Sequence, residues 1–240
     1  MLSLMVWTRR AFIGRAAAAA AVPAAVVAAV KISGSAGSAK AGEPKAAGTR
    51  KAVARRTPAE NSLAGDRHWW IRSLGAPDAI LGYTGQASVL PGEPIDLYVS
   101  TTSREFKVSA FRMGWYGGDL ARKVWQSGTV RGHKQRSADF DGATRTVYTR
   151  WGVSLTVPTH DWPAGSYLFR LDAHSGGQRY VPVTVRSAST AGKVVLKNAV
   201  PTWQAYNTWG EYDLYLGPGG GYSDRSYAVS LDRPGDTDGA

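Results

Sequence analysis

The chain has 240 residues, a formal net charge of +11 and no cysteine. The missing cysteine excludes disulfides, thiolate metal sites and cysteine nucleophiles. The charge is concentrated at the N-terminus: residues 1–56 carry ten lysines and arginines against one acid, Glu43, whereas residues 57–240 carry 19 basic and 17 acidic residues. Because the body of the chain is nearly neutral, it lacks the basic surface that is typical of nucleic-acid-binding proteins.

The first 41 residues predict an export signal of the twin-arginine type. Arg9 and Arg10 stand in the sequence Thr-Arg-Arg-Ala-Phe-Ile-Gly, and small apolar residues follow from 16 to 30. This run is shorter than the roughly 20 residues that a membrane-spanning helix needs, and Ala39-Lys40-Ala41 offers a cleavage site. We therefore expect an extracellular or cell-envelope protein with no stable membrane span after cleavage. The alternative is an uncleaved membrane anchor.

Residues 42–61 predict a disordered basic linker. They consist mainly of alanine, lysine, arginine, glycine and proline, with almost no large apolar residue. Such a segment cannot bury enough apolar surface to offset the entropy lost on ordering.

Residues 62–188 predict an immunoglobulin-like β-sandwich. Short runs of alternating apolar and polar residues are separated by turns that contain glycine or proline, a pattern typical of this fold. No stretch shows the 3.6-residue period of a long helix, so the fold class is mainly β. The expected strands cover residues 79–84, 88–90, 94–101, 106–113, 123–130, 154–157, 166–173 and 180–186.

The run Phe-Arg-Met-Gly-Trp-Tyr-Gly-Gly at residues 111–118 has two interpretations. Trp115 and Tyr116, beside Arg112, suit a stacking platform for a sugar or a planar ligand. Alternatively, the glycines form a turn with positive φ while Trp115 plugs the sandwich. We favour the second interpretation, because an aromatic pair is common at the corners of sandwiches.

Residues 192–240 predict the N-terminal part of an α/β domain. The β-branched run at 193–199 is consistent with the first strand of a parallel sheet. The residues that follow are too few for a doubly wound sheet, because each βα unit takes about 30 residues or more. We therefore expect an incomplete domain in a shortened chain. The alternative is a sandwich protein whose aromatic tail folds back on it.

Residues 201–213 read Pro-Thr-Trp-Gln-Ala-Tyr-Asn-Thr-Trp-Gly-Glu-Tyr-Asp and are rich in aromatic rings. After a buried strand, such a segment could form the floor of a pocket, because the loops at strand ends carry the sites of open α/β sheets. An aromatic packing patch is the other interpretation.

Most motifs of known chemistry are missing. The four histidines have no zinc-binding spacing, and there is no Gly-x-Ser-x-Gly motif of a serine hydrolase. The glycines at 217–221 lack the Lys-Ser/Thr of a phosphate-binding loop. Glu211 and Asp213 would point to opposite sides of an extended chain, so they do not form an acid/base pair.

Several short motifs together resemble those of one family. They are Pro-Gly-Glu at 91–93, the run 111–118, Trp-Pro-Ala-Gly-Ser-Tyr at 162–167, Thr-Trp-Gln-Ala-Tyr-Asn at 202–207 and Ser-Leu-Asp-Arg-Pro at 230–234. In these motifs and their order, residues 61–234 resemble the large (beta) subunit of N,N-dimethylformamidase and its bacterial relatives. The resemblance implies an amide hydrolase in which a glutamine-amidotransferase-like α/β domain follows the sandwich. It also implies a small amide substrate and a small partner subunit or an oligomer.

The same resemblance implies a mononuclear Fe(III) site held by two tyrosinates and one glutamate. Tyr206, in Gln-Ala-Tyr-Asn, matches the motif of the first tyrosine, and Tyr227 best matches the second, with Tyr222 as the alternative. A phenolate is a hard anionic donor that suits Fe(III), and the iron would polarise an amide carbonyl and activate water. The glutamate ligand and the catalytic acid and base of the family fall beyond Ala240, so we expect the chain as given to be inactive.

A hypothesis of another class needs no catalysis. An exported β-sandwich module would bind a carbohydrate or a protein partner through an aromatic surface. That surface would consist of Trp115, Tyr116, Trp203 and Trp209.

Overall fold

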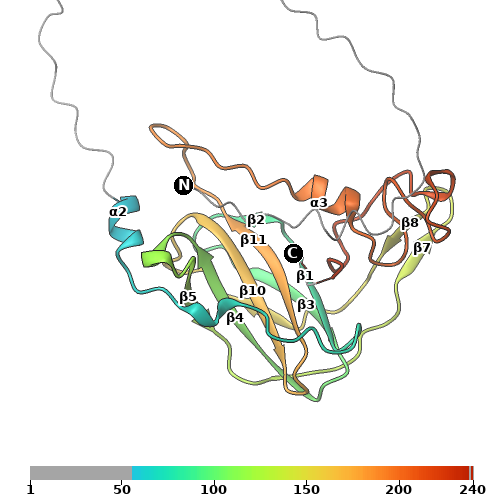
Figure 1. Cartoon of the computed structure of the whole chain (residues 1–240), viewed down its shortest axis with the longest axis horizontal. Helices are drawn as coiled ribbons and strands as arrows, with labels where there is room; N and C mark the ends of the chain where they lie inside the picture. Colours follow the sequence, from blue (N-terminus) through green and yellow to red (C-terminus); the bar gives the residue numbers. More distant parts are fainter. Residues whose placement is uncertain (1–55, 238, 240) are drawn as a thin grey trace, which may run out of the picture. The chain divides into compact units, whose positions relative to one another are not determined.

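The structure, a computed structural model, describes residues 56–237 and 239, which lie in one compact unit formed by residues 51–240. The centre of this unit is a sandwich of two β-sheets (Figure 1). The larger sheet has six strands in the order β2-β11-β10-β4-β5, with β6 also paired to β4, and the smaller has the order β1-β3-β9. A separate hairpin joins β7 to β8. The mainly β sandwich expected from the sequence is therefore confirmed.

The strands are β1 (Ile80–Thr84), β2 (Ser88–Val89), β3 (Ile95–Thr101), β4 (Glu105–Met113), β5 (Ala121–Gln126), β6 (Val130–Arg131), β7 (Asp139–Asp141), β8 (Thr146–Tyr148), β9 (Leu155–Val157), β10 (Gly165–Ala173) and β11 (Gln178–Val185). The helices are α2 (Arg56–Asn61) and α3 (Val200–Tyr206), with short 3-10 turns η1 (Arg67–Trp69), η2 (Tyr116–Gly118) and η3 (Tyr222–Asp224). The long strands lie within a few residues of their predicted positions, whereas the hairpin of β7 and β8 was not predicted.

Strand β10 forms the middle of the larger sheet, where it pairs antiparallel with β4 on one side and β11 on the other. Tyr167, Phe169 and Leu171 point into the core, whereas Leu168 belongs to a cluster on the opposite face. This follows from the two-residue period of a strand. The inner face packs against buried residues of the smaller sheet: Ile80, Ile95, Leu97 and Val99.

The outer face of the larger sheet is covered by the segment that precedes β1. Trp69 is only 1% exposed and packs with Phe111, Leu168 and Tyr180. Its indole Nε1 donates to the Asp119 carbonyl oxygen at 2.9 Å, and its own carbonyl oxygen accepts from the Tyr180 hydroxyl at 2.8 Å. A single tryptophan therefore closes a second hydrophobic cluster and satisfies its own polar atoms there.

Helix α2 occupies the last six residues of the predicted linker, so the prediction of disorder is wrong for residues 56–61. The helix is held by Glu60, whose Oε1 accepts from the Tyr116 hydroxyl (2.8 Å) and from Arg122 Nη2 (2.7 Å). Arg112 Nη1 lies 3.7 Å from the same oxygen. Sequence composition did not predict this helix, because the anchoring charges are far away in the chain.

Glu60→Gln should weaken the fold at neutral pH and have less effect in acid. Burial opposes ionisation of Glu60, but hydrogen bonds from Arg122 and Tyr116 and the charges of Arg122 and Arg112 outweigh it, so its pKa lies below the ordinary 4.5. A lowered pKa means that the carboxylate stabilises the folded state above that ordinary value, and that the contribution is lost as the pH falls through the folded pKa. Thermal unfolding at about pH 7 and about pH 3 should show a larger difference from the wild type at the higher pH. A difference of equal size at both values would contradict this role of the charge.

The turn at 111–118 is built differently from the favoured interpretation. Gly117 and Gly118 do adopt positive φ, at 67° and 99°. Trp115, however, is 62% exposed, whereas Tyr116 is 1% exposed and fills the corner of the sandwich. The prediction that Trp115 plugs the sandwich is therefore wrong, because the turn reverses which of the two rings faces inward.

Residues 193–199 do not pair as a strand, so the strand predicted there is wrong for this chain. Val194 is fully exposed and Leu196 is largely so. The aromatic stretch that follows is not extended, because it begins with helix α3, which carries a proline, Pro201, in its first turn. Proline is tolerated there, since its missing N–H would have no partner within the helix.

The predicted export signal, with its arginine pair and its cleavage site, lies outside the described residues, as does the linker up to residue 55. Among the helices of residues 56–237, none has the length and apolar character needed to cross a membrane.

Candidate functional site

A buried arginine organises the C-terminal segment (residues 200–237). Arg233 is 0% exposed, and its guanidinium donates five hydrogen bonds. They run from Nε to Gln204 Oε1 (3.2 Å), from Nη1 to the carbonyl oxygens of Trp209 (3.3 Å) and Tyr212 (2.9 Å), and from Nη2 to those of Gln204 (2.9 Å) and Asn207 (3.1 Å). Carbonyls at a helix C-terminus lack partners within the helix and carry partial negative charge, so a cation satisfies them well.

Arg233 keeps its charge at neutral pH. Burial lowers its pKa to about 10, against the opposing influence of the Asp213 and Asp236 carboxylates. The arginine is therefore a permanent cation held mainly by backbone oxygens. All five N–H groups of its guanidinium already donate hydrogen bonds, so none is free to bind an anionic ligand. The role of Arg233 in the segment is therefore structural.

Asn207 completes the same structure. Its side-chain nitrogen donates to the Pro234 carbonyl oxygen at 2.8 Å and to Gln204 Oε1 at 2.9 Å. The motifs at 202–207 and 230–234 are thus two halves of one arrangement, which fixes the end of α3. It is the end of this helix that carries Tyr206.

The C-terminal segment packs on the hairpin of β7 and β8, beside which its loops lie in Figure 1. Phe140 contacts Tyr212 with ring centroids 5.0 Å apart, and the Thr149 backbone N–H donates to the Asp232 carbonyl oxygen at 2.8 Å. Gly210, with φ of 81°, lies so close to Val147 that a Cβ would come within 2.6 Å of its methyl carbon. The unpredicted hairpin is therefore the platform for the aromatic stretch, which supports the packing interpretation of that stretch.

Tyr206 and Tyr215 form a stacked pair on this segment, with centroids 4.3 Å apart and ring planes 13° from parallel. A hydrogen bond to Tyr206, repulsion from charge on Tyr206, some burial and the Asp213 carboxylate together raise the pKa of Tyr215. The two hydroxyls therefore interact as well as the rings, and Tyr206 is 43% exposed.

Tyr227 and Tyr222 lie in a different cluster, around Arg225. The Arg225 guanidinium carbon is 3.8 Å from the ring centroid of Tyr222 and 5.5 Å from that of Tyr227. Arg145 lies on Tyr227 as well, at 5.3 Å. These are cation–π contacts, so both rings already face a positive charge.

The family of the chain follows from its match to a model of a known protein family. A family model described as N,N-dimethylformamidase beta subunit-like, C-terminal, matches residues 107–240. The chain belongs to this family. The match begins within β4 and covers the strands through β11 and the whole C-terminal segment, including both motifs that surround Arg233.

Other comparisons add little to the family assignment. A search of curated proteins finds no match. Among solved structures, a cycloisomaltooligosaccharide glucanotransferase from Paenibacillus sp., in complex with cycloisomaltoheptaose, has 16% identity and a TM-score of 0.29, over 46% of this chain and 14% of that one. An uncharacterized protein from Bacillus anthracis str. Ames has 9% identity and a TM-score of 0.27, over 43% and 80%. The chain thus spans about one seventh of the glucanotransferase, and TM-scores this low establish no shared fold.

The ferric site implied by the N,N-dimethylformamidase-like family is only partly matched by the described residues. Tyr206 fits a ligand, since the residue is 43% exposed and a phenolate is a hard oxygen donor. Tyr227 fits poorly, because two guanidinium groups next to its ring would repel a trivalent cation. Among residues 56–237, no group of three or more histidine, cysteine or acidic side chains could hold a metal ion. These residues do not form a complete ferric site.

The aromatic surface of the alternative hypothesis is not a single surface. Trp115 and Trp203 are exposed, but Tyr116 is buried, where its hydroxyl accepts from Arg112 and donates to Glu60. Trp209 is partly buried and packs edge-on against Trp151 at 6.3 Å. Tyr116 is therefore excluded from a stacking platform, and Trp209 serves mainly in packing.

Proposed function

We propose that this chain is an exported member of the N,N-dimethylformamidase beta subunit-like family and that the full-length protein acts in iron-dependent hydrolysis of small amides. The observation that carries the proposal is the joining of two motifs of the family around Arg233, which fixes the end of α3 and leaves Tyr206 partly exposed. The export signal predicted at residues 1–41 supports a location outside the cytoplasm.

Tyr206 is the residue proposed to supply a phenolate ligand. Its partner Tyr215, stacked on it with ring centroids 4.3 Å apart, would help to orient the ligand, as neighbours of metal ligands do generally. Tyr227 remains a predicted second ligand, and the arginines beside it make it the weaker of the two.

Tyr206→Phe should abolish iron binding. The full-length protein, loaded with iron in air, is expected to show a visible tyrosinate-to-iron absorption band, and Tyr206→Phe should remove that band because the donor oxygen is gone. Tyr227→Phe and Tyr222→Phe test the second ligand in the same assay, and Tyr98→Phe, a sandwich tyrosine stacked on Tyr83, is the matched control.

Two readouts accompany the spectrum. Release of amine from N,N-dimethylformamide tests the hydrolytic reaction. A separate experiment tests export: changing Arg9 and Arg10 to lysine should leave the chain in the cytoplasm if the export proposal is right. A colourless full-length protein without bound iron would overturn the iron proposal. Export unaffected by loss of both arginines would overturn the twin-arginine assignment.

A further inference from the structure

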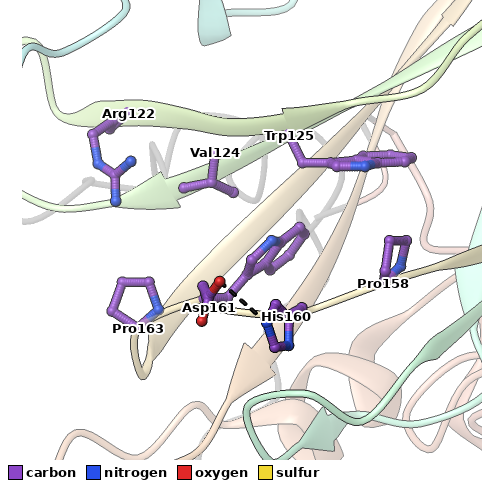
Figure 2. Close-up of a pocket in the computed structure, with 8 residues that line it drawn as sticks. Arg122, Val124, Trp125, Pro158, His160, Asp161 and Pro163 are labelled. Atoms are coloured by element: carbon purple, nitrogen blue, oxygen red, sulfur yellow. Dashed lines mark ion pairs between the residues drawn. The ribbon is translucent and has the colours of Figure 1, made fainter.

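A pocket of about 280 Å³ lies between strand β5 and the loop at residues 158–163 (Figure 2). Its size is near the lower end of small-molecule sites, which hold roughly 300–1,000 Å³, and suits a ligand with one ring. None of the three tyrosines considered as iron ligands lines it, so it is separate from the site proposed above. Its lining includes Arg122, Val124 and Trp125 on β5 and Pro158, His160, Asp161 and Pro163 on the loop.

Both walls of the pocket depend on irregular backbone. On β5, Trp125 pairs with Ala110 and Lys123 pairs with Phe111, so Val124 is an extra residue in a β-bulge. The bulge allows Val124 and Trp125, neighbours in the chain, to line the same pocket, whereas a regular strand would point them to opposite faces. Bulges that redirect a side chain in this way are common beside functional sites.

The opposite wall has its own irregularity at Asp161. This residue adopts φ of 60°, which is unfavourable for a residue other than glycine and is retained only where the surroundings impose it. The loop is fixed by Trp162, which is buried and stacks on Tyr167 at 5.0 Å, and by Thr159, whose hydroxyl donates to the Glu93 carbonyl oxygen at 2.7 Å. The wall is therefore preformed, and Asp161 stays at its exposed tip.

The charged and polar groups around the pocket lie in pairs. Arg122 Nη2 lies 2.7 Å from Glu60 Oε1, and His160 Nε2 lies 3.3 Å from Asp161 Oδ2. Glu60 neutralises the Arg122 guanidinium, while the exposed imidazole and carboxylate of the second pair supply hydrogen-bond donors and acceptors. A neutral polar ligand suits this arrangement better than an ion does.

The apolar surfaces point to the same kind of ligand. Trp125, Pro158 and Pro163 offer flat or rigid faces around the cavity. The weakly positive C–H groups on one face of a sugar ring pack well on the electron-rich face of an indole, while the ring hydroxyls can bond to a planar carboxylate or imidazole. We propose that the pocket between β5 and loop 158–163 is a binding subsite for one neutral sugar ring of a saccharide.

The test is titration of the full chain with cellotetraose, chitotetraose and maltotetraose at millimolar concentrations, followed by nuclear magnetic resonance of the tryptophan indole N–H groups. At least one saccharide should shift the Trp125 signal. Trp125→Ala and Asp161→Gly should each weaken binding by about tenfold or more. Asp161→Gly is the sharper variant, because glycine adopts the positive φ freely and only the exposed carboxylate is lost.

Trp70→Ala is the matched control. Trp70 is an exposed tryptophan that does not line the pocket, so its removal should leave saccharide binding unchanged. No binding of any of the three saccharides would overturn the proposal. So would binding that survives Asp161→Gly with the Trp125 signal unshifted. Loss of binding in Trp115→Ala but not in Trp125→Ala would also overturn it and place the sugar on the 111–118 turn.

Discussion

Arg233→Met should release the C-terminal segment from the sandwich and destabilise the protein by about 3–5 kcal/mol, the range found when one partner of a buried charged interaction is removed. Methionine fills similar space but offers no donor, so four backbone carbonyls and the Gln204 amide oxygen each lose a hydrogen bond. The two Gln204 oxygens keep donors from Asn207, whereas the carbonyls of Asn207, Trp209 and Tyr212 lose the donor that Arg233 supplies. Each buried acceptor left without a donor costs about 1–3 kcal/mol. The sandwich core is untouched, so the opening should be local.

Hydrogen exchange and limited proteolysis can locate this opening. Residues 200–237 should exchange quickly and become cleavable in the Arg233→Met variant, while β10 and β11 remain protected. Arg225→Met is the matched control, because Arg225 is only partly buried and its side chain makes one hydrogen bond, to the Tyr222 carbonyl oxygen. Wild-type protection across the segment in Arg233→Met would show that the guanidinium does not hold it.

Trp69→Ala should destabilise the sandwich itself by about 3–5 kcal/mol, as expected for truncation of a fully buried tryptophan. The change empties the cluster on the outer face of the larger sheet, and it leaves the Asp119 carbonyl oxygen without its indole donor. Urea unfolding measured by circular dichroism should show an earlier midpoint with a similar slope.

The neighbouring Trp70 provides the control. It has the same ring and stacks on Trp69 at 3.9 Å, but it is half exposed. Trp70→Ala should therefore cost about 0.5–1.5 kcal/mol, the contribution of an aromatic pair. Equal losses in the two variants would mean that burial of Trp69 is not what secures this face.

The sheet strands could be predicted because their pattern is local. In β10 and β11, apolar side chains alternate on either side of a Ser-Gly-Gly turn, and that alternation alone places them within two residues. The hairpin of β7 and β8 has strands of three residues, too short to show a period. Helix α3 was missed because its first turn follows an apolar run that favours a strand.

The candidate site was predictable only in part. Tyr206 follows from the motif around it, but its partner Tyr215 meets it across a turn that no spacing rule indicates. Arg233 was identified only as part of the motif at 230–234. Its burial was not predicted, because charged residues are expected on the surface. Its burial depends on carbonyl oxygens that lie 21 to 29 residues away in the chain.

The exposed run at 193–199 has a consequence for behaviour in concentrated solution. Val194, Val195 and Leu196 present apolar side chains on a backbone that pairs with no strand in the described part of the chain. Such a segment is a template for strand addition by another molecule and hence for aggregation. Lys193 and Lys197 bracket it with positive charge and act as gatekeepers against self-association. Colloidal stability at this surface therefore depends on two charges, and high salt or lysine acetylation would weaken the protection that they give.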